Sequence, residues 1–424
     1  MSTSVRQSSG LLLLRVFAPV ALGYFLSYLF RVVNAVIAPN LSQDLALDAA
    51  GLGLLTSVYF LAFAAFQLPL GVLLDRYGPR RTESALLLIA AAGALLFARA
   101  ESLTALVAAR ALIGLGASAC LMAAFKAFVL WFPAPRLPLI NGLQMAAGGL
   151  GAITATAPVE ALLRVTDWRG IFTLLALLTF LVAVAVFTIV PEQPGEGAKP
   201  DLRLQLLGIA TIFRNRFFWR IAPWTVASQT SFLAIQGLWA GPWLRDVAGL
   251  ARPEIAQVLL LIAIAMVAGF FLLGWMAERL GRRGISPMTV AAVGMGVFML
   301  AQLPLVFQWS LPVRPLWLLF GFCGTVNILP YAALSQSVPA QLAGRAITGL
   351  NLLVFVAAFA AQWGIGAVIG LWPPVDAGFS STGYRAAFGL ILAIQVMGGV
   401  WFAIAGRKEK RRPNGRLETS SGGE

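Results

Sequence analysis

The chain has 424 residues, of which 59% are hydrophobic and only 11% are charged. A soluble globular protein carries roughly 25% charged residues because water must solvate its surface, so this composition excludes a soluble protein and indicates one that crosses a membrane many times. The net charge of +14 comes from Lys and Arg residues that lie between apolar stretches rather than on one polar domain, which argues against nucleic-acid binding.

The polar residue types also exclude several classes of enzyme. The chain has no His, and its two cysteines, Cys120 and Cys323, both lie inside apolar runs. Without His the commonest metal ligand and general base near neutral pH is missing, and two such cysteines provide neither a disulfide framework nor the spacing of a metal site. We therefore expect no enzyme, no catalytic residue, no metal site and no cofactor.

Twelve stretches are long and apolar enough to cross the bilayer, because a spanning helix needs about 20 mostly apolar residues. In chain order they cover residues 16–38, 50–74, 82–99, 103–130, 137–162, 170–190, 217–244, 253–277, 286–307, 313–337, 344–371 and 384–406. A polar segment rich in Pro and Gly follows the sixth stretch and divides the chain near its middle. We predict an all-α membrane protein with twelve transmembrane helices. Its parts are a six-helix bundle over 1–190, a cytoplasmic linker over 191–216, a second six-helix bundle over 217–406 and a basic cytoplasmic tail over 407–424.

The distribution of positive charge predicts the orientation of these helices. An even number of spans places both termini on one side, and cytoplasmic loops carry an excess of Lys and Arg. The tail from Arg407 to Arg412 and the loop from Arg279 to Arg283 hold much of the positive charge on the side of the termini. We therefore predict a multi-pass protein of the cell inner membrane, surrounded by lipid, with both termini in the cytoplasm.

Two patterns recur after about half the chain length, which indicates an internal repeat. The loop after the second predicted span carries Gly71, Asp75, Arg76, Gly78, Arg80 and Arg81, and the loop after the eighth carries Gly274, Glu278, Arg279, Gly281, Arg282 and Arg283. A weaker repeat opens the sixth span with Trp168 and Arg169 and the twelfth with Tyr384 and Arg385. We infer two pseudo-symmetric six-helix bundles around a central cavity.

The loop motif resembles the signature of the major facilitator superfamily, which carries it between its second and third helices and again between its eighth and ninth. Arg110, Gly114 and Gly116 resemble the fourth-helix motif of the same superfamily. The resemblance implies a secondary transporter that works by alternating access, with two halves that rock around a site near the bilayer midplane. It also implies that the loops latch the inside-closed conformation and that Arg110 acts in gating or proton transfer. The residues with implied gating roles are Gly71, Asp75, Arg76, Gly78, Arg80, Arg81, Arg110, Gly274, Glu278, Arg279 and Arg282.

Two further cations, Arg31 and Lys126, lie within predicted spans, where a charge costs at least about 2.5–3.5 kcal/mol. The first span runs outward and the fourth inward, so the two side chains have similar predicted depths. No carboxylate in the first six spans lies at an obvious matching depth. We therefore predict that both cations face one cavity and bind an anionic substrate. The alternatives are an internal structural pair for Arg31 and snorkelling of Lys126 to the helix end.

The spacing of Tyr28, Arg31 and Pro39 is similar to that in the first helix of the organophosphate:phosphate antiporters and the anion:cation symporters. In the symporters a cationic residue also precedes a Trp-Phe-Pro sequence by five residues, as Lys126 precedes residues 131–133 here. This second resemblance implies that Arg31 and Lys126 bind the carboxylate or phosphate of the substrate.

Other polar side chains complete the predicted site, because hydrogen-bonding groups are costly in lipid unless they are satisfied. The predicted substrate-binding set is Arg31, Lys126, Tyr28, Asn34, Gln144, Gln236, Asn327 and Asn351. Each uncharged member could equally serve helix packing. Phe30 stands where the symporters often carry an acid, so their route of proton coupling is not carried over. Glu160 on the fifth span is the proton-coupling candidate, with a solvated interface residue as the alternative.

The function that these patterns favour is secondary active transport of a small organic anion across the inner membrane, coupled to an ion. The expected partners of this protein are a small anionic substrate, membrane lipid and a proton, and we expect a monomer. One alternative is an efflux carrier for amphipathic compounds, which would tolerate Arg31→Ala. Another is a non-transporting sensor built on the same scaffold.

Overall fold

The structure of the protein is a computed structural model that describes residues 12–133, 136–192, 211–338, 340–375 and 378–410. Throughout these residues the regular elements are helices, apart from one isolated bridge between Val375 and Gly378. A helix satisfies every backbone hydrogen bond within its own segment, which is what the hydrocarbon core of a membrane requires. The predicted all-α class is therefore confirmed.

The helices form two consecutive sets, one from each half of the chain. The first set is η1 (Leu13–Phe17), α2 (Ala18–Val32), α3 (Asn34–Asp44), α4 (Ala49–Arg99), α5 (Leu103–Ala117), α6 (Cys120–Trp131), α7 (Leu137–Thr154), α8 (Ala157–Leu162) and α9 (Trp168–Ile189). The second set is α11 (Arg216–Ala234), η3 (Ile235–Trp239), α12 (Ala240–Asp246), α13 (Arg252–Gly281), α14 (Pro287–Phe307), α15 (Val313–Cys323), η4 (Gly324–Ile328), α16 (Leu329–Gln336), α17 (Ala340–Ile369) and α18 (Ser381–Lys410). The predicted linker lies largely outside the described residues, and α18 continues into the predicted tail.

Ten helical segments among the described residues are long and apolar enough to cross a membrane. They correspond to ten of the twelve predicted spans. The other two predicted spans, 137–162 and 217–244, are helices with internal interruptions: α7 gives way to α8, and α11 passes through η3 into α12. The twelve-helix architecture thus holds, and interruptions also occur in the first crossing (α2 to α3), the fourth (α5 to α6) and the tenth (α15 through η4 to α16).

The second and third predicted spans join at a sharp bend inside α4. Gly78 has φ 75° and ψ 169°, a conformation that a residue with a β-carbon rarely adopts. In the second half the corresponding turn is made by Gly284, with φ 83°, rather than by Gly281 of the repeated motif. The two loops therefore turn at slightly different places although their sequences repeat.

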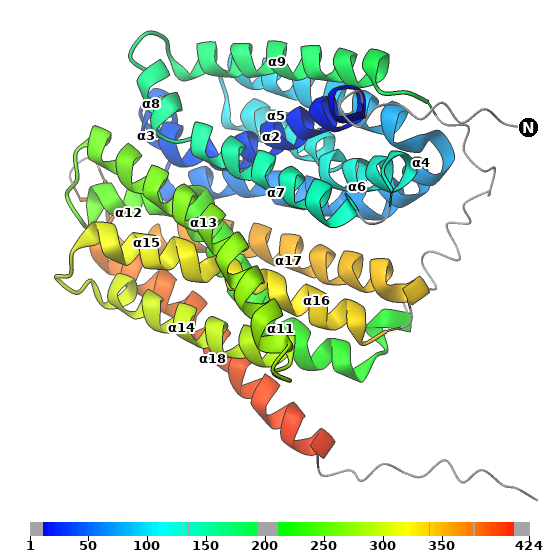
Figure 1. Cartoon of the computed structure of the whole chain (residues 1–424). Coiled ribbons are helices and arrows are strands. Elements are labelled where there is room, and N and C mark those ends of the chain that lie inside the picture. The colour runs from blue at the N-terminus through cyan, green and yellow to red at the C-terminus, as the bar shows by residue number, and fades with distance from the viewer. Residues whose placement is uncertain (1–11, 134–135, 193–210, 339, 376–377, 411–424) are drawn as a thin grey trace, which may run out of the picture.

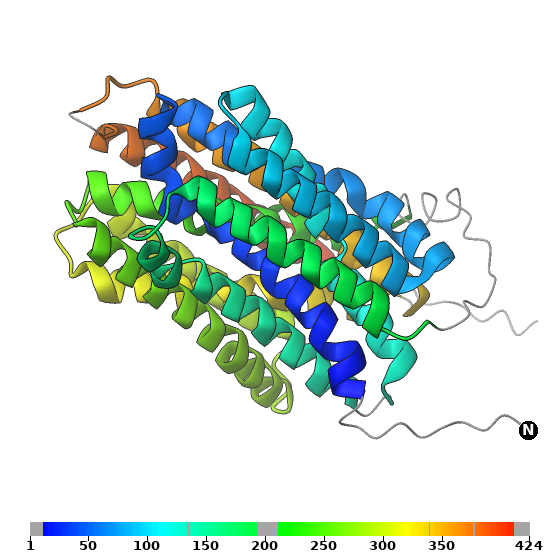
Figure 2. The ribbon, with the colours of Figure 1, turned by 90° about the horizontal axis from the view of Figure 1, so that it is seen from above.

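The two halves lie side by side, and both ends of the described chain lie at the same end of the molecule (Figure 1). We call this the terminal end, and the end that holds α3, α8 and α12 the distal end. Close contacts join the halves at the distal end. A β-carbon on Gly366 would lie 2.2 Å from the carbonyl oxygen of Ala49, and one on Gly241 would lie 2.4 Å from that of Ala35. Seen from above, the long helices of both halves run roughly parallel (Figure 2).

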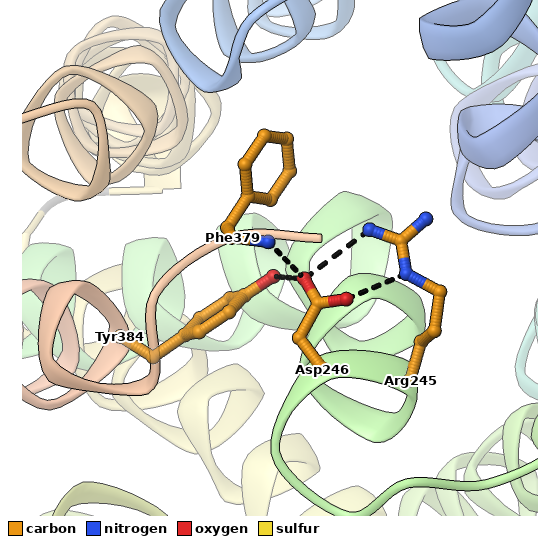
Figure 3. Close-up of polar contacts among 4 residues, drawn as sticks. All are labelled: Arg245, Asp246, Phe379 and Tyr384. Atoms are coloured by element: carbon orange, nitrogen blue, oxygen red, sulfur yellow. Dashed lines mark hydrogen bonds and ion pairs between the residues drawn. The ribbon is translucent and has the colours of Figure 1, made fainter. Parts of the chain in front are cut away.

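The weaker sequence repeat closes each half at its distal end through an acid and a buried aromatic side chain. In the second half the carboxylate of Asp246 accepts hydrogen bonds from the Tyr384 hydroxyl (2.7 Å), the Phe379 amide (3.0 Å) and Arg245 Nε (2.6 Å), as Figure 3 shows. In the first half the carboxylate of Asp44 accepts from Trp168 Nε1 at 2.7 Å. Each acid ends the first crossing of its half, and each aromatic residue lies at the start of the sixth.

The arginine that follows each of these aromatic residues joins the third crossing of its half. Arg169 donates to the carbonyl oxygens of Ala98 (3.2 Å) and Ala100 (2.6 Å), at the end of α4. Arg385 donates to the side chain of Gln308 (3.4 Å), at the end of α14. The two halves therefore use the same packing arrangement, in which an arginine joins the start of the sixth crossing to the end of the third. In the first half this arginine satisfies carbonyl groups at a helix end, which need donors.

Candidate functional site

A cavity of about 270 Å³ lies between the two halves. Helices α2, α4 and α7 contribute to its wall from the first half, and α11, α13 and α17 from the second. Its polar lining residues are Tyr24, Ser27, Tyr28, Arg31, Gln67, Ser118, Gln229, Gln236, Thr325, Tyr331 and Asn351. Phe, Leu and Met side chains fill the wall between them, so the cavity is mostly apolar with a few polar groups, as is usual for small-molecule sites.

Four of these residues share one face of α2, namely Tyr24, Ser27, Tyr28 and Arg31. Their spacing of three and four residues places them in a row along a helix, because side chains at these intervals lie above one another. The row leads from the terminal end toward Arg31 in the last turn of α2. One helix of the first half thus supplies three of the hydroxyl groups that line the cavity together with Arg31.

Arg31 is enclosed by aromatic rings from both halves. Its guanidinium carbon lies 4.6 Å from the ring centre of Tyr28, 5.6 Å from that of Phe63 and 5.5 Å from that of Phe355. The side chain is only 8% exposed, its Nε has no hydrogen-bond partner, and within the described residues it forms no ion pair. The faces of aromatic rings stabilise a cation but leave its planar N–H groups available for an anion.

The backbone beside Arg31 is held by a second buried arginine. Arg110 on α5 is 1% exposed and donates from one Nη to the carbonyl oxygen of Phe30 at 2.9 Å. Its guanidinium carbon lies 5.2 Å from the ring centre of Tyr59, whose hydroxyl in turn contacts Ser27 at 3.5 Å. Arg110 therefore does not line the cavity but fixes the segment of α2 that presents Arg31.

The structure places four members of the predicted substrate-binding set in the cavity wall: Arg31, Tyr28, Gln236 and Asn351. Asn351 accepts a hydrogen bond from the hydroxyl of Tyr331 at 3.3 Å, so these two groups form a polar pair on the second half. Gln236 lies in η3, where the seventh crossing changes its helical pitch. That these residues bind substrate stays a prediction.

The structure corrects the prediction for Lys126. Its Nζ forms an ion pair with the carboxylate of Asp75 and donates to the carbonyl oxygen of Leu74 at 2.8 Å, both at the terminal end of the second crossing. Lys126 therefore does not share a chamber with Arg31. The physical reason is depth: Arg31 lies beside Phe63 of α4, whereas Lys126 reaches Leu74 and Asp75 farther along the same helix, about 17–18 Å nearer the terminal end at 1.5 Å per residue.

Three uncharged members of the predicted set also lie outside the cavity wall. Asn34 donates to the hydroxyl of Thr56 at 3.1 Å, Gln144 donates to a backbone carbonyl of α2 at 3.4 Å, and Asn327 donates to a carbonyl of its own helical turn at 2.8 Å. These contacts join neighbouring segments of one half. These contacts are of the kind that polar side chains commonly make in helix packing, and the binding role of the three residues stays a prediction.

Glu160, the proton-coupling candidate, lies at the distal end, and its role in proton coupling stays a prediction. Its carboxylate pairs with Arg252 Nε at 2.8 Å, and Arg252 also donates to the side chain of Asn40 at 2.6 Å. Glu160 and Asn40 belong to the first half and Arg252 to the second. This distal latch of Glu160, Arg252 and Asn40 fastens the halves together at the distal end.

The repeated loops make their described contacts within their own halves. Arg80 and Arg81 pair with Glu192 at 3.7 and 2.6 Å, and Asp75 pairs with Lys126. In the second half Glu278 pairs with Arg282 at 2.6 Å, and the guanidinium of Arg279 lies 5.3 Å from the ring centre of Trp275. The latching of the inside-closed conformation by these loops stays a prediction.

Several cavity residues escaped the sequence analysis. Ser27, Ser118 and Thr325 are small polar residues inside apolar helices, and no pattern distinguishes their lining role from packing. Phe63 follows Tyr59 by four residues and precedes Gln67 by four, so the helical spacing placed it on a polar face of α4. Phe355 comes from the other half, and only the association of the halves brings it to Arg31.

Comparisons with known proteins agree with this arrangement. A family model described as Major Facilitator Superfamily matches residues 20–362. A probable sulfoacetate transporter of Cupriavidus necator is 23% identical over 335 residues, covering 69% of this chain and 78% of that protein. A hexuronate transporter of Bacillus subtilis is 28% identical over 186 residues, covering 43% of this chain and 44% of that protein.

Two solved structures share the fold over nearly the whole chain. A bacterial homolog of the human lysosomal transporter Spinster, in an inward-facing and unoccupied conformation, has a TM-score of 0.74 at 16% identity and covers 95% of this chain and 98% of its own. A D-xylose-proton symporter has a TM-score of 0.74 at 14% identity and covers 92% of this chain and 97% of its own.

Proposed function

Because the chain belongs to the major facilitator superfamily and is a membrane transporter rather than an enzyme, we propose that it carries a small organic anion by alternating access. In this proposal the protein lies in the cell inner membrane with both termini in the cytoplasm. The terminal end is then the cytoplasmic side, and the distal end is the outer side. The first six crossings and the last six move against each other as two units.

The observation that carries the proposal is the cation in the central cavity. Arg31 presents its guanidinium among Tyr28, Phe63 and Phe355 without a carboxylate partner in the described part of the chain. A charge buried without a counter-ion is unfavourable, and an arginine pairs especially well with a planar carboxylate or with a sulfonate. An anionic substrate would supply the missing charge when it enters the cavity.

The shape and polarity of the cavity support a small substrate. The volume of about 270 Å³ is just below the usual range for ligand pockets, which run from roughly 300 to 1,000 Å³. Hydroxyl and amide groups of Ser27, Gln67, Gln236 and Asn351 surround the space around Arg31 and can hydrogen-bond the hydroxyls of a sugar acid. The names of several relatives, which include sulfoacetate, hexuronate and L-galactonate transporters, support the same chemical class.

The distribution of contacts between the halves supports the alternating-access mechanism. In the described conformation the distal latch and the close approach of Gly366 to Ala49 close the distal end. At the terminal end Asp75 is engaged by Lys126 of its own half. Closing the terminal end would require Asp75 to exchange this partner for contacts with the second half while the distal latch opens.

The test of this function uses purified protein in proteoliposomes, with labelled sulfoacetate and galacturonate as probes. Arg31→Gln removes the positive charge, and Arg31→Lys keeps the charge but removes the planar pair of N–H donors of the guanidinium. We expect each variant to weaken substrate affinity at least about tenfold, since a hydrogen bond to a charged group contributes about 1.5–3 kcal/mol. Lys126→Gln is the matched control, because it removes a cation of the same half that lies outside the cavity. Its binding of the same probes, measured by thermal shift, should match that of the wild type.

The outcome that would overturn the proposal is full affinity for both probes in both Arg31 variants. Retained transport of amphipathic compounds in Arg31→Ala, together with no binding of organic anions by the wild type, would instead favour an efflux carrier. Binding without any transport in the wild type would favour a sensor on the same scaffold.

A further inference from the structure

One buried carboxylate plays no part in the site or in the distal latch. Glu83 lies in α4, within the apolar segment Pro69–Arg99, and its residue exposure is 0%. Within the described chain neither of its carboxylate oxygens has a hydrogen-bond partner. From the sequence no acid of the first six spans lies at an obvious matching depth, because Glu83 stands beside the charged loop and resembles the solvated start of a helix.

The surroundings of Glu83 are apolar and closely packed. A β-carbon on Gly23 of α2 would lie 2.6 Å from Oε1 of Glu83 and 3.5 Å from Cδ1 of Leu87, so only a glycine leaves room for the carboxyl group. The titratable group that faces Glu83 from α6 is the thiol of Cys120, which is itself fully buried. The carboxyl group is thus enclosed between α2, α4 and α6.

The cations on the neighbouring helices are engaged elsewhere or face away. Arg31 of α2 lies in the cavity among aromatic rings, Arg110 of α5 bonds the backbone of α2, and Lys126 of α6 pairs with Asp75. In the described residues no ion pair reaches Glu83. An ionised carboxylate in such a position costs several kcal/mol, whereas a neutral carboxylic acid costs far less. The described packing therefore suits the protonated side chain.

Residues next to Glu83 are adjacent in the chain to residues of the cavity wall. Its neighbour Gly23 precedes Tyr24, and its neighbour Cys120 precedes Leu121, and both of these following residues line the cavity. A movement of α2 or α6 that admits substrate or water to the cavity would therefore also displace the residues beside the carboxyl group of Glu83. This proximity links the charge state of Glu83 to the position of the helix that carries Arg31.

We propose that Glu83 is the proton-binding site that couples anion transport to a proton gradient. One proton binds a carboxylate oxygen of Glu83 to form the neutral acid, and the same O–H bond breaks to release the proton to water when α2 separates from α4. The protonated acid permits the packing in the described conformation, and the ionised form favours a conformation in which water reaches it. This inference rests on the proposed transport of an organic anion.

The first experiment separates proton coupling from transport as such. Glu83→Gln keeps the shape of the neutral acid but cannot release a proton. In proteoliposomes with labelled sulfoacetate or galacturonate, this variant should retain substrate counterflow, which needs no net proton movement, and should lose accumulation driven by a pH gradient. Glu101→Gln is the control, because Glu101 is an exposed acid in the next loop, and it should retain both activities. Gradient-driven accumulation by Glu83→Gln at the wild-type level would overturn the proposal.

A second measurement needs no substrate. Infrared spectra of the purified protein at neutral pH should contain the carbonyl stretch of a protonated carboxylic acid, and the band should disappear in Glu83→Gln but not in Glu101→Gln. Gly23→Ala places a methyl group against the carboxyl oxygen and should shift the pH at which the band is lost. If the wild type transports neither probe, the proposed function fails while the infrared band still decides the protonation of Glu83. A spectrum without this band, or one unchanged in Glu83→Gln, would refute the proton site.

Discussion

The distal latch offers the sharpest test of how the two halves are held. Glu160 of α8 and Arg252 of α13 form an ion pair with contacts of 2.8 and 3.0 Å, and Arg252 also bonds Asn40 at 2.6 Å. The side chain of Glu160 is 11% exposed and that of Arg252 is 42% exposed. Replacing Glu160 by Gln or Arg252 by Gln removes the attraction between the halves without disturbing the interior of either bundle.

The size of the effect follows from the exposure of the pair. A hydrogen bond between charged groups contributes about 1.5–3 kcal/mol when buried, whereas a fully exposed pair contributes about 0–1 kcal/mol. This pair is half-buried, so we expect each variant to lose about 1–2 kcal/mol of the free energy that favours the distal-closed conformation. The ratio of distal-closed to distal-open molecules should then fall by about 5–30-fold.

The assay is a distance measurement between spin labels at the distal end of the two halves. Val165 and Leu371 are 81% and 76% exposed and can be replaced by cysteine, while the native Cys120 and Cys323 are buried. Both latch variants should broaden the label distances toward longer values. The double variant Glu160→Arg with Arg252→Glu should return them toward those of the wild type.

A matched control removes a distal charge that lies on one half only. Arg164→Gln removes an exposed cation a few residues from Glu160 and should leave the distances unchanged. If the latch variants give the same distances as the wild type and as this control, the ion pair does not hold the distal end, and the reasoning from burial and geometry is refuted.

The remaining predictions concern the packing of each half. Tyr384→Phe removes one donor from the carboxylate of Asp246, and we expect thermal unfolding in detergent to show a loss of about 1–2 kcal/mol, since two other donors remain; an unchanged melting temperature would contradict this. Trp168→Phe removes the equivalent hydrogen bond of the first half and should lower stability by a similar amount, measured in the same way. Gly114→Ala would place a β-carbon 2.3 Å from the carbonyl oxygen of Tyr59, so it should reduce the yield of folded protein, and a yield equal to that of the wild type would refute the close approach of α5 and α4.

Much of the architecture could be predicted from the sequence because the bilayer imposes simple rules. The thickness of the hydrocarbon core determined the length of the apolar stretches, and the repeated motifs determined that two similar bundles would form. Burial of Arg31 also followed, because a cation inside an apolar span must find a polar environment. The same rules could not locate the interruptions within crossings, since hydropathy does not report a change of helical pitch at η3 or a break before α8.

The partners of the charged residues depended on the tertiary structure. The position of a residue along a span indicates its depth only coarsely, and it does not give the direction in which the side chain points around the helix axis. Lys126 lies nearer the terminal end than Arg31 and pairs with Asp75, and Glu160 finds its partner on the other half of the chain. In the sequence Glu83 resembles the polar start of a helix, and only the packing of neighbouring helices such as α2 buries it. Sequence thus determined how many charges the membrane must accommodate, and only the packing of helices distant in the chain decided which of them are neutralised by a neighbour and which remain for a substrate or a proton.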